Sequence, residues 1–313
     1  MDAKGASPDS TSSGAIEHRA HARVGLLGNP SDVYFGRTIS FTLGNFWASV
    51  RLEPSDELVI RPHPTHDFVH FRSLDHLTGL SGSSAIVCAA LSCLLDFYRV
   101  RHLIKVELRP NLILAAEKEL GIVAGLQDRV AQVYGGLVYM DFSKEYMDDL
   151  RHGIYTPMDI SLLPPLNLIY AENPSDSGKV HSTVRQRWLN GDEFIISSIL
   201  EVANIAKEGR TALLEKDYSK LAKLMNRNFD IRRSMFGDDA LGALNIKMVE
   251  VARKVGAASK FTGSGGAVVA LCPDGPSQVK LLQDGCQKAG LIVVPVEVVP
   301  SCLNADELQT LKK

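Results

Sequence analysis

The first third of the chain changes from a strand-like to a helix-like pattern of apolar positions. Between Ala22 and Pro54, β-branched and aromatic residues are interrupted by Gly and Pro, which predicts antiparallel strands. The stretches ELVIRP and DFVHF continue this pattern. From Ser83 onward, apolar residues recur three and four positions apart, so a buried helix is expected directly after the small residues of GLSGSSA.

Two more helices and a strand complete the first half. NLILAAEKELG predicts a helix that ends at Gly121, and AGLQDRVAQVYGG predicts another that ends at a pair of glycines. LVYMDF then has the composition of a strand. A connection with Pro and Asp at residues 150–163 follows, and we place the domain boundary there.

The second half contains the longer helices. After the buried strand PPLNLIYAEN, residues 180–255 carry extended helical patterns. A strand, a helix and a strand are then expected over KFTGSGGAVVALCP, PSQVKLLQDGCQKAG and LIVVPVEVV. Sheet and helices in each half predict an α+β protein.

The pattern divides the chain into a tail and two domains. Residues 1–19 are rich in Ser, Gly and Asp, have little to bury and are expected to be disordered, with structure starting near Ala22. The domains are expected at residues 20–160 and 161–313.

Composition narrows the class of protein. The 313 residues are 45% hydrophobic and 22% charged, with 34 basic against 36 acidic side chains, which argues against nucleic acid as a partner. No apolar run approaches the roughly 18 to 20 residues of a membrane-spanning helix, so no membrane association is expected. The 5 cysteines lack CxxC spacing and the first residues lack an apolar leader, so reduced thiols and a cytoplasmic location are expected. The sequence does not indicate an oligomeric state.

The stretch GLSGSSA combines small residues with a helix start. Unpaired backbone N–H groups and the helix dipole favour an anion there. Gly79 and Gly82 would let phosphate oxygens approach the backbone, while Ser83 and Ser84 offer hydroxyls to phosphate or Mg²⁺. No Lys-Ser/Thr closes a Walker A motif. An N-cap with glycines for close packing is the alternative.

Two carboxylates follow that stretch. Asp128 lies in an otherwise apolar segment, so it is either a first-turn acid that complements the helix dipole or a group held for chemistry. Glu117 is either a surface acid or a hard oxygen ligand for Mg²⁺.

The turn in ARVGLLGNPSDVYFGR is polar. Its Asn29, Ser31 and Asp32 can bond their own backbone, or Asp32 can accept hydrogen bonds from substrate hydroxyls while Arg23 steers charge on a transferring phosphoryl group. FTGSGGAVVAL is either a hairpin connection or a place where backbone approaches a ligand.

A histidine cluster in RPHPTHDFVHFRSLDHL is not expected to bind metal. In a strand, residues four positions apart lie roughly 13 Å from each other, which is too far for two ligands of one ion. The histidines concerned are His63, His66, His70 and His76.

In their order along the chain, these motifs resemble the GHMP kinases, a family of small-molecule kinases. The resemblance runs from Ala22 to the C-terminus and implies a ribosomal-protein-S5-type (S5 domain 2-like) N-terminal domain, a ferredoxin-like C-terminal domain, and ATP and Mg²⁺ as cofactors. The stretches GNPSDVYFGRTIS, YAENPSDSGKVHSTVRQRWLNGD and KFTGSGGAVVAL look closest to a plant-type branch that acts on a sugar acid. This implies phosphorylation of D-glucuronate at its anomeric hydroxyl, with ADP as product, in UDP-glucuronate salvage.

The resemblance also implies residue roles. Asp128 would be the catalytic base or the group that orients the acceptor hydroxyl, Arg23 would lie beside the phosphoryl group, and Ser84 with Glu117 would hold Mg²⁺. The phosphate-binding loop would be Gly79, Leu80, Ser81, Gly82, Ser83, Ser84 and Ala85. Substrate-binding positions would be Ser31, Asp32, Gly263 and Gly265. Candidates for the substrate carboxylate, by residue type only, are Arg185, Arg187, Arg232 and Arg233.

Two departures from the family pattern keep alternatives open. Asn29-Pro30 stands where galactokinases carry Glu-His, which argues against galactose. Only 49 positions separate Pro30 from Gly79, fewer than the family usually has, so a segment is expected to be missing near residue 77. The alternatives are a kinase for a neutral sugar such as galactose or arabinose, a kinase for mevalonate, and a catalytically silent kinase-like binding protein.

Overall fold

The computed structural model describes residues 14–57, 59, 80–122, 124–172 and 181–311. Its first sheet is antiparallel, with strand order β1-β2-β3-β4. The strands are β1 (Ile16–Leu27), β2 (Arg37–Leu52), β3 (Leu137–Asp141) and β4 (Ile154–Met158). The long β1–β2 hairpin pairs Ile16 with Leu52 at its outer end and Leu27 with Ile39 at its inner end.

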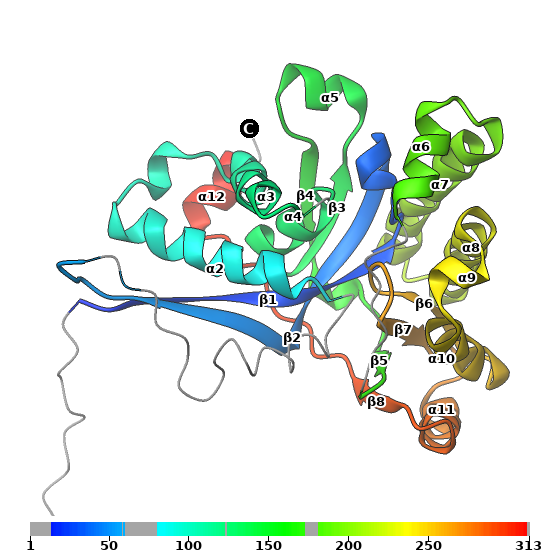
Figure 1. Cartoon of the computed structure of the whole chain (residues 1–313). Coiled ribbons are helices and arrows are strands. Elements are labelled where there is room, and N and C mark those ends of the chain that lie inside the picture. The colour runs from blue at the N-terminus through cyan, green and yellow to red at the C-terminus, as the bar shows by residue number, and fades with distance from the viewer. Residues whose placement is uncertain (1–13, 58, 60–79, 123, 173–180, 312–313) are drawn as a thin grey trace, which may run out of the picture.

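The first lobe contains α2 (Gly82–Phe97), α3 (Arg109–Glu119), α4 (Gln127–Tyr134) and α5 (Lys144–Asp149). Helices α2, α3 and α4 lie together along one side of the β1–β2 hairpin (Figure 1). Small residues form the contact between α2 and the hairpin, among them Ala20, Ala48, Ala85 and Ala89, which are all buried. Because they carry only a methyl group, the helix can approach the sheet closely.

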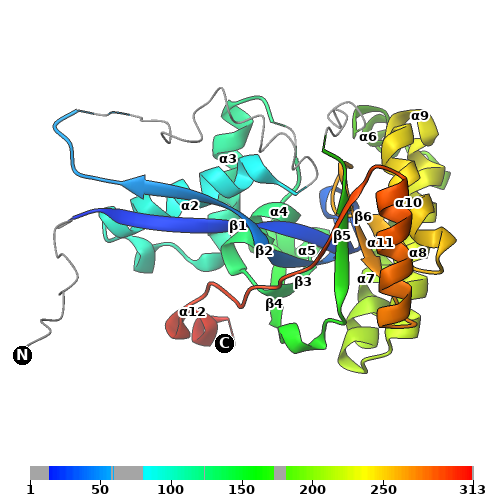
Figure 2. The ribbon, with the colours of Figure 1, turned by 90° about the horizontal axis from the view of Figure 1, so that it is seen from below.

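The second sheet has the order β6-β7-β5-β8 and is also antiparallel. Its strands are β5 (Leu166–Tyr170), β6 (Ala258–Phe261), β7 (Ala267–Leu271) and β8 (Ile292–Pro295). Its helices are α6 (His181–Leu189), α7 (Glu193–Leu214), α8 (Tyr218–Phe236), α9 (Asp238–Leu241), α10 (Ala243–Lys254) and α11 (Pro276–Lys288). They gather at the end of the molecule opposite the outer end of the hairpin, where Ile16 pairs with Leu52 (Figure 2).

The two lobes share parts of their cores. On α7, a Cβ at Gly209 would collide with Leu27 of β1, so this glycine lets α7 pack against the first sheet. The last part of the chain returns to the first lobe and ends in α12 (Ala305–Thr310). There, Arg109 Nη1 donates to Glu307 Oε1 at 2.5 Å. The last residues of the segment 161–313 therefore pack on the first lobe.

Most elements expected from the sequence are present. The helix after GLSGSSA begins at Gly82, the next helix is followed by Gly121 with a positive φ of 78°, and LVYMDF forms β3. The strand, helix and strand expected near the C-terminus are β6 with β7, α11 and β8. The α+β prediction is confirmed.

One expectation about the N-terminus is wrong. The disordered tail was expected to reach residue 19, but β1 begins at Ile16. The early start has two physical reasons: these residues pair with the end of β2, and His18 Nε2 lies 2.6 Å from Asp96 Oδ2 on α2.

Some expectations fall outside the described residues. These are the strand DFVHF, most of ELVIRP, the four clustered histidines and the shortened segment near residue 77. Within the described part of the chain, no helix combines the length and apolar character that crossing a membrane requires. All 5 cysteines are free thiols, as expected.

Candidate active site

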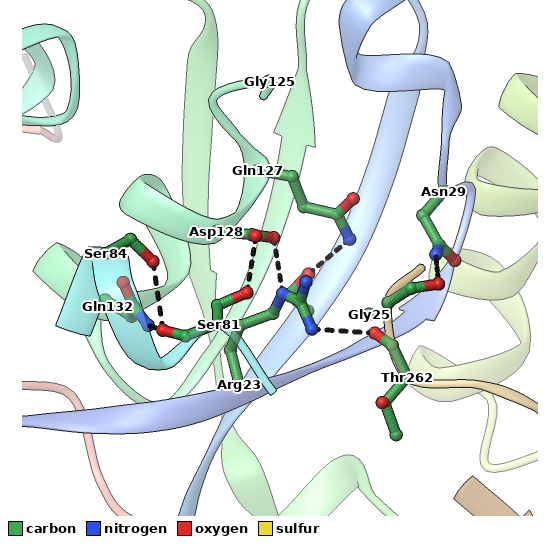
Figure 3. A network of polar contacts seen from close by, with 12 residues as sticks. Arg23, Gly25, Asn29, Ser81, Ser84, Gly125, Gln127, Asp128, Gln132 and Thr262 are labelled. Atoms are coloured by element: carbon green, nitrogen blue, oxygen red, sulfur yellow. Dashed lines mark hydrogen bonds and ion pairs between the residues drawn. The ribbon is translucent and has the colours of Figure 1, made fainter. Parts of the chain in front are cut away.

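Four segments that are distant in sequence meet beside the start of α2. Arg23 on β1 is buried, and its Nε donates to Asp128 Oδ1 at the start of α4 at 2.5 Å. Its Nη1 donates to the carbonyl of Thr262, between β6 and β7, at 3.0 Å. Ser81 Oγ, just before α2, donates to Asp128 Oδ2 at 2.5 Å. Figure 3 shows Arg23, Ser81 and Asp128 pointing toward one another, and the second lobe meets the first at Arg23, beside this carboxylate.

The predicted phosphate loop is tied down at Ser81. This residue adopts a left-handed backbone conformation (φ 64°, ψ 51°), which is uncommon outside glycine. Its carbonyl accepts hydrogen bonds from Ser84 Oγ at 3.1 Å and Gln132 Nε2 at 2.8 Å. Leu80 and Ala85 are buried, Gly82 and Ser83 open the helix, and Gly79 lies outside the described residues.

Asp128 is held as a carboxylate. Burial opposes its ionisation, but the guanidinium groups of Arg23 and Arg129 outweigh that cost and lower its pKa to about 2. The side chain remains 21% exposed. The site therefore presents a fixed negative charge at neutral pH, beside the first turn of α2.

Asp32 behaves differently although it lies close by. It belongs to the 3₁₀ turn η1 (Ser31–Tyr34), and its Oδ2 accepts from the backbone N–H of Gln127 at 3.3 Å. A Cβ on Gly125 would collide with this carboxylate, so the glycine makes room for it. Burial and the neighbouring charge of Asp128 raise the pKa of Asp32 to about 6. The pKa values of these two neighbouring carboxylates thus differ widely, a pattern found at active sites.

Ser31 does not present its hydroxyl to the site. Its side chain is fully buried, and its Oγ donates to the carbonyl of Arg37 at 2.9 Å. Its predicted role in substrate binding stays a prediction, and its observed contact is with the protein backbone.

Glu117 forms a buried ion pair. Its Oε2 accepts from Arg129 Nε at 2.5 Å, and its Oε1 accepts from Ser83 Oγ at 3.1 Å. Glu117 is fully buried, whereas Ser83 is exposed at the start of α2. The predicted metal partner Ser84 instead bonds the carbonyl of Ser81.

One carboxylate oxygen of Glu117 keeps the capacity to accept a metal ion. The strong bond from Arg129 engages Oε2 of Glu117, while Oε1 has only the Ser83 hydroxyl and faces the helix start where phosphate is expected. Mg²⁺ is commonly held by one or two carboxylates together with phosphate oxygens and water. The donor set therefore fits Mg²⁺ through Glu117 Oε1, with Ser83 as the neighbouring hydroxyl.

Lys260 ties the second lobe to β1 and the η1 turn. Its Nζ donates to the carbonyl of Gly25 at 2.6 Å, to Asn29 Oδ1 at 2.8 Å and to the carbonyl of Phe261 at 2.6 Å. Burial, with Arg232 and Arg23 nearby, lowers the pKa of Lys260 well below its ordinary value. Asn29 is thereby occupied with protein contacts.

Asn245 on α10 fixes the TGSGG connection between β6 and β7. This buried side chain accepts from the backbone N–H of Gly266 at 2.8 Å, and a Cβ at Gly265 would lie 2.7 Å from its Nδ2. The carbonyl of Gly263 accepts from Asn29 Nδ2 at 3.4 Å. Both predicted glycines therefore lie in the loop that meets the first lobe, and their role toward substrate stays a prediction.

The residue pattern alone did not identify several members of this network. Six of them are buried polar side chains: Gln127, Arg129, Gln132, Asn245, Lys260 and Asn228, whose Oδ1 accepts from the backbone N–H of Gly28 at 2.8 Å. Two are glycines, Gly25 and Gly125, at which a Cβ would collide with site residues. A signal existed for Arg129, which shares the apolar segment QDRVAQVY with Asp128. For most of the others, only contacts between distant segments reveal the role.

Comparisons with known proteins agree with this geometry. The model described as "GHMP kinases N terminal domain" matches residues 68–136, and "GHMP kinases C terminal" matches residues 210–289. "Glucuronokinase 1" of Arabidopsis thaliana is 66% identical over 360 positions, which cover 97% of this chain and 99% of that protein. "Probable glucuronokinase 2" of the same plant is 64% identical, with 96% of each chain covered.

Solved structures share the fold. A Lin0012 protein from Listeria innocua superposes with a TM-score of 0.73 at 14% identity, covering 93% of this chain and 99% of that one. At that identity the likeness concerns the fold alone.

The alignment with the first Arabidopsis protein is longer than this chain. The alignment with the first Arabidopsis protein has 360 positions, whereas the chain has 313 residues, so at least 47 positions fall opposite gaps in it. The place of the missing segment, expected near residue 77, stays a prediction.

Proposed function

This chain belongs to the GHMP kinase family, and on that premise we propose that it transfers the γ-phosphoryl group of ATP to the anomeric hydroxyl of D-glucuronate. The products are D-glucuronate 1-phosphate and ADP. The Asp128 carboxylate supports this assignment most directly, because two hydrogen bonds of 2.5 Å fix it beside the predicted phosphate loop. The relatives of 64% and 66% identity support the choice of acceptor.

Asp128 is suited to orient the acceptor hydroxyl. A carboxylate with a pKa of about 2 accepts a proton poorly at neutral pH, but it accepts a hydrogen bond well. Phosphoryl transfer depends mainly on positioning and on neutralising charge. Asp128 would align the attacking oxygen, while Arg23 both holds Asp128 and places positive charge at the phosphoryl group.

The backbone at the start of α2 would receive the phosphates. Its first N–H groups have no partner within the helix and lie at the positive end of the helix dipole. Mg²⁺, when bound, would neutralise phosphate charge; Glu117 Oε1 and the Ser83 hydroxyl are the groups of this chain that would hold it.

An assay of ADP release with a panel of acceptors tests the proposal. The purified chain is incubated with ATP, Mg²⁺ and D-glucuronate, D-galactose, L-arabinose or mevalonate, and the phosphorylated product is identified by mass spectrometry and ³¹P NMR. D-Glucuronate 1-phosphate is the expected product. Equal turnover with galactose would exclude a sugar-acid kinase. A folded chain that binds no ATP in calorimetry would instead indicate a silent kinase-like protein.

Two further parts of the proposal concern the chain itself. We place its activity in the cytoplasm, in salvage of free glucuronate toward UDP-glucuronate, and fractionation of cells that express the chain tests the location. Intact-mass measurement of the natural protein would establish whether the polypeptide lacks the segment that its relatives carry.

A further inference from the structure

The cations around the site differ in what neutralises them. Arg23 and Arg129 each contact a carboxylate. Lys260 donates its three N–H groups to three oxygen acceptors. Arg232 forms no ion pair with any carboxylate of the described residues, although its side chain is only 3% exposed. Among the described residues it is thus a buried guanidinium without an ion-pair partner.

The surroundings of Arg232 leave donor capacity unused. Its Nε has no hydrogen-bond partner within the part of the chain that the structure describes, and its Nη2 donates to the carbonyl of Ser264 over a long 3.4 Å. The rings of Phe236 and Phe261 flank the group, with centres 5.2 Å and 5.6 Å from Cζ. These rings hold the guanidinium in place through cation–π attraction but cannot accept a fork of hydrogen bonds.

Arg232 also lies within electrostatic reach of the site. Burial, and then repulsion from Arg23, lower its pKa to about 10, while Asp32 and Tyr34 act in the opposite direction. Ser264, whose carbonyl accepts from Arg232, belongs to the TGSGG connection that meets Arg23 at Thr262. The guanidinium therefore lies beside the connection that contacts the proposed site and interacts electrostatically with Arg23 and Asp32.

We propose that Arg232 binds the carboxylate of the sugar acid and so selects D-glucuronate over neutral sugars, an inference that rests on the proposed function. A carboxylate is planar and accepts two parallel N–H bonds from a guanidinium. It would supply both the missing counter-charge and an acceptor for Nε. Leaving a buried charge unpaired is costly, so its pairing only in the substrate complex favours the charged ligand.

The other arginines proposed for this role have different surroundings. Arg187 donates to Asp192 at 2.7 Å, and its side chain is 41% exposed. Arg233 donates to Asp238 through Nε and Nη2, both at 2.6 Å. Arg185 is exposed on α6, close enough to Tyr34 to affect its pKa, and is the runner-up.

The test compares D-glucuronate with D-glucuronamide, which has the same ring but no negative charge. In Arg232→Gln, the KM for D-glucuronate is expected to rise about 10- to 100-fold, the range for losing hydrogen bonds to a charged group. The KM for ATP should stay within about twofold, and the preference for D-glucuronate over D-glucuronamide should largely disappear. Arg233→Gln is the matched control, because it removes the neighbouring charge on α8 and should retain the wild-type preference.

The outcomes distinguish a failure of the inference about Arg232 from a failure of the proposed function. If wild type releases no ADP with D-glucuronate, the proposed function fails. If wild type is active and Arg232→Gln keeps its preference, only the inference fails, and a loss of preference in Arg185→Gln would move the role to Arg185. A rise in the KM for ATP alone would assign Arg232 to phosphate instead.

A second variant covers the case in which Arg232→Gln does not fold. Arg232→Lys keeps the charge and the stem but lacks the planar fork. With a cooperative thermal transition intact, it should still show a KM for D-glucuronate several-fold above wild type. An unchanged KM in folded Arg232→Lys, with an unchanged preference over D-glucuronamide, would refute bidentate binding by this residue.

Discussion

Replacing Asp128 by Asn changes the charge of the site with little change in shape. The carboxylate accepts from Arg23 Nε and Ser81 Oγ, both at 2.5 Å, and Asn retains only one acceptor oxygen. We expect kcat with D-glucuronate to fall about 10²- to 10³-fold, the usual effect of removing a preorganised group at the reacting atoms. The affinity for ATP should change little, because the described contacts of Asp128 do not include the first N–H groups of α2.

The same variant should be less stable by a predictable amount. Neighbouring guanidiniums overcome burial and lower the pKa of Asp128 from 3.8 to about 2. A lowered pKa means that the ionised form stabilises the fold above pH 3.8 and that this contribution is lost as the pH falls through about 2. At about 1.36 kcal/mol per pKa unit, it amounts to roughly 2 kcal/mol at pH 7. The difference from wild type should shrink between about pH 4 and pH 2.

A matched control distinguishes chemistry from stability. Asp141 on β3 also pairs with an arginine, Arg37 Nε at 2.7 Å, and its side chain is 16% exposed against 21% for Asp128. Asp141→Asn should lower the free energy of unfolding without a comparable loss of kcat. ADP release, calorimetry with ATP and urea unfolding measure the three quantities. Wild-type kcat in Asp128→Asn would remove this residue from the mechanism, and equal kcat losses in both variants would refute a local role.

Three further substitutions, one of them with Gly285→Ala as its control, have expected outcomes. Asp32→Asn should raise the free energy of unfolding by at most about 3 kcal/mol, and the gain should be larger at pH 7.5 than at pH 4.5. Burial raises the pKa of Asp32 to about 6, so the wild-type fold loses stability as the pH rises from 3.8 through 6. Equal gains in urea unfolding at the two pH values would contradict this. Gly25→Ala should cost about 1 to 3 kcal/mol, since its Cβ would lie 2.9 Å from a carbonyl of the facing lobe, whereas Gly285→Ala meets only a valine methyl at 3.5 Å and should be near neutral in thermal unfolding. Ser81→Ala should lower kcat about 10-fold by removing a hydrogen bond to a carboxylate, with an unchanged KM for ATP; an unaltered kcat would argue against this role.

The sequence was most informative where the local pattern alone determines structure. The helix after GLSGSSA begins at Gly82 because small residues are followed by apolar ones at helical spacing. The early start of β1 at Ile16 was missed, because its polar residues gain order from β2 and from Asp96 rather than from a local apolar pattern. Local patterns therefore predicted helix starts better than strand ends.

In the site, too, some residues can be recognised from the neighbouring sequence, whereas others are recognised only from contacts between distant segments. Asp128 was singled out because a carboxylate stood in an apolar segment. Arg232 could be named only by residue type, yet it lies three positions after Phe229 and seven after Met225 on the buried face of α8. An arginine among the apolar positions of a helix can be detected from the sequence as a charge expected to be buried. What the sequence could not show is that no carboxylate of the described residues meets it.

The difference in length between this chain and its first Arabidopsis alignment should affect the binding of ATP and the binding of the acceptor differently. At least 47 positions of the first Arabidopsis alignment have no counterpart here, but Asp128 is held by Arg23 and Ser81, which are both present and placed by β1 and the start of α2. Lys260 fixes the approach of the second lobe through two bonds to described residues of the first, Gly25 and Asn29. The contacts that we propose to position the acceptor thus form entirely between described residues. A loss of activity in this chain would therefore be sought first in ATP binding, and the calorimetric measurement with ATP separates that case from a defect at Asp128.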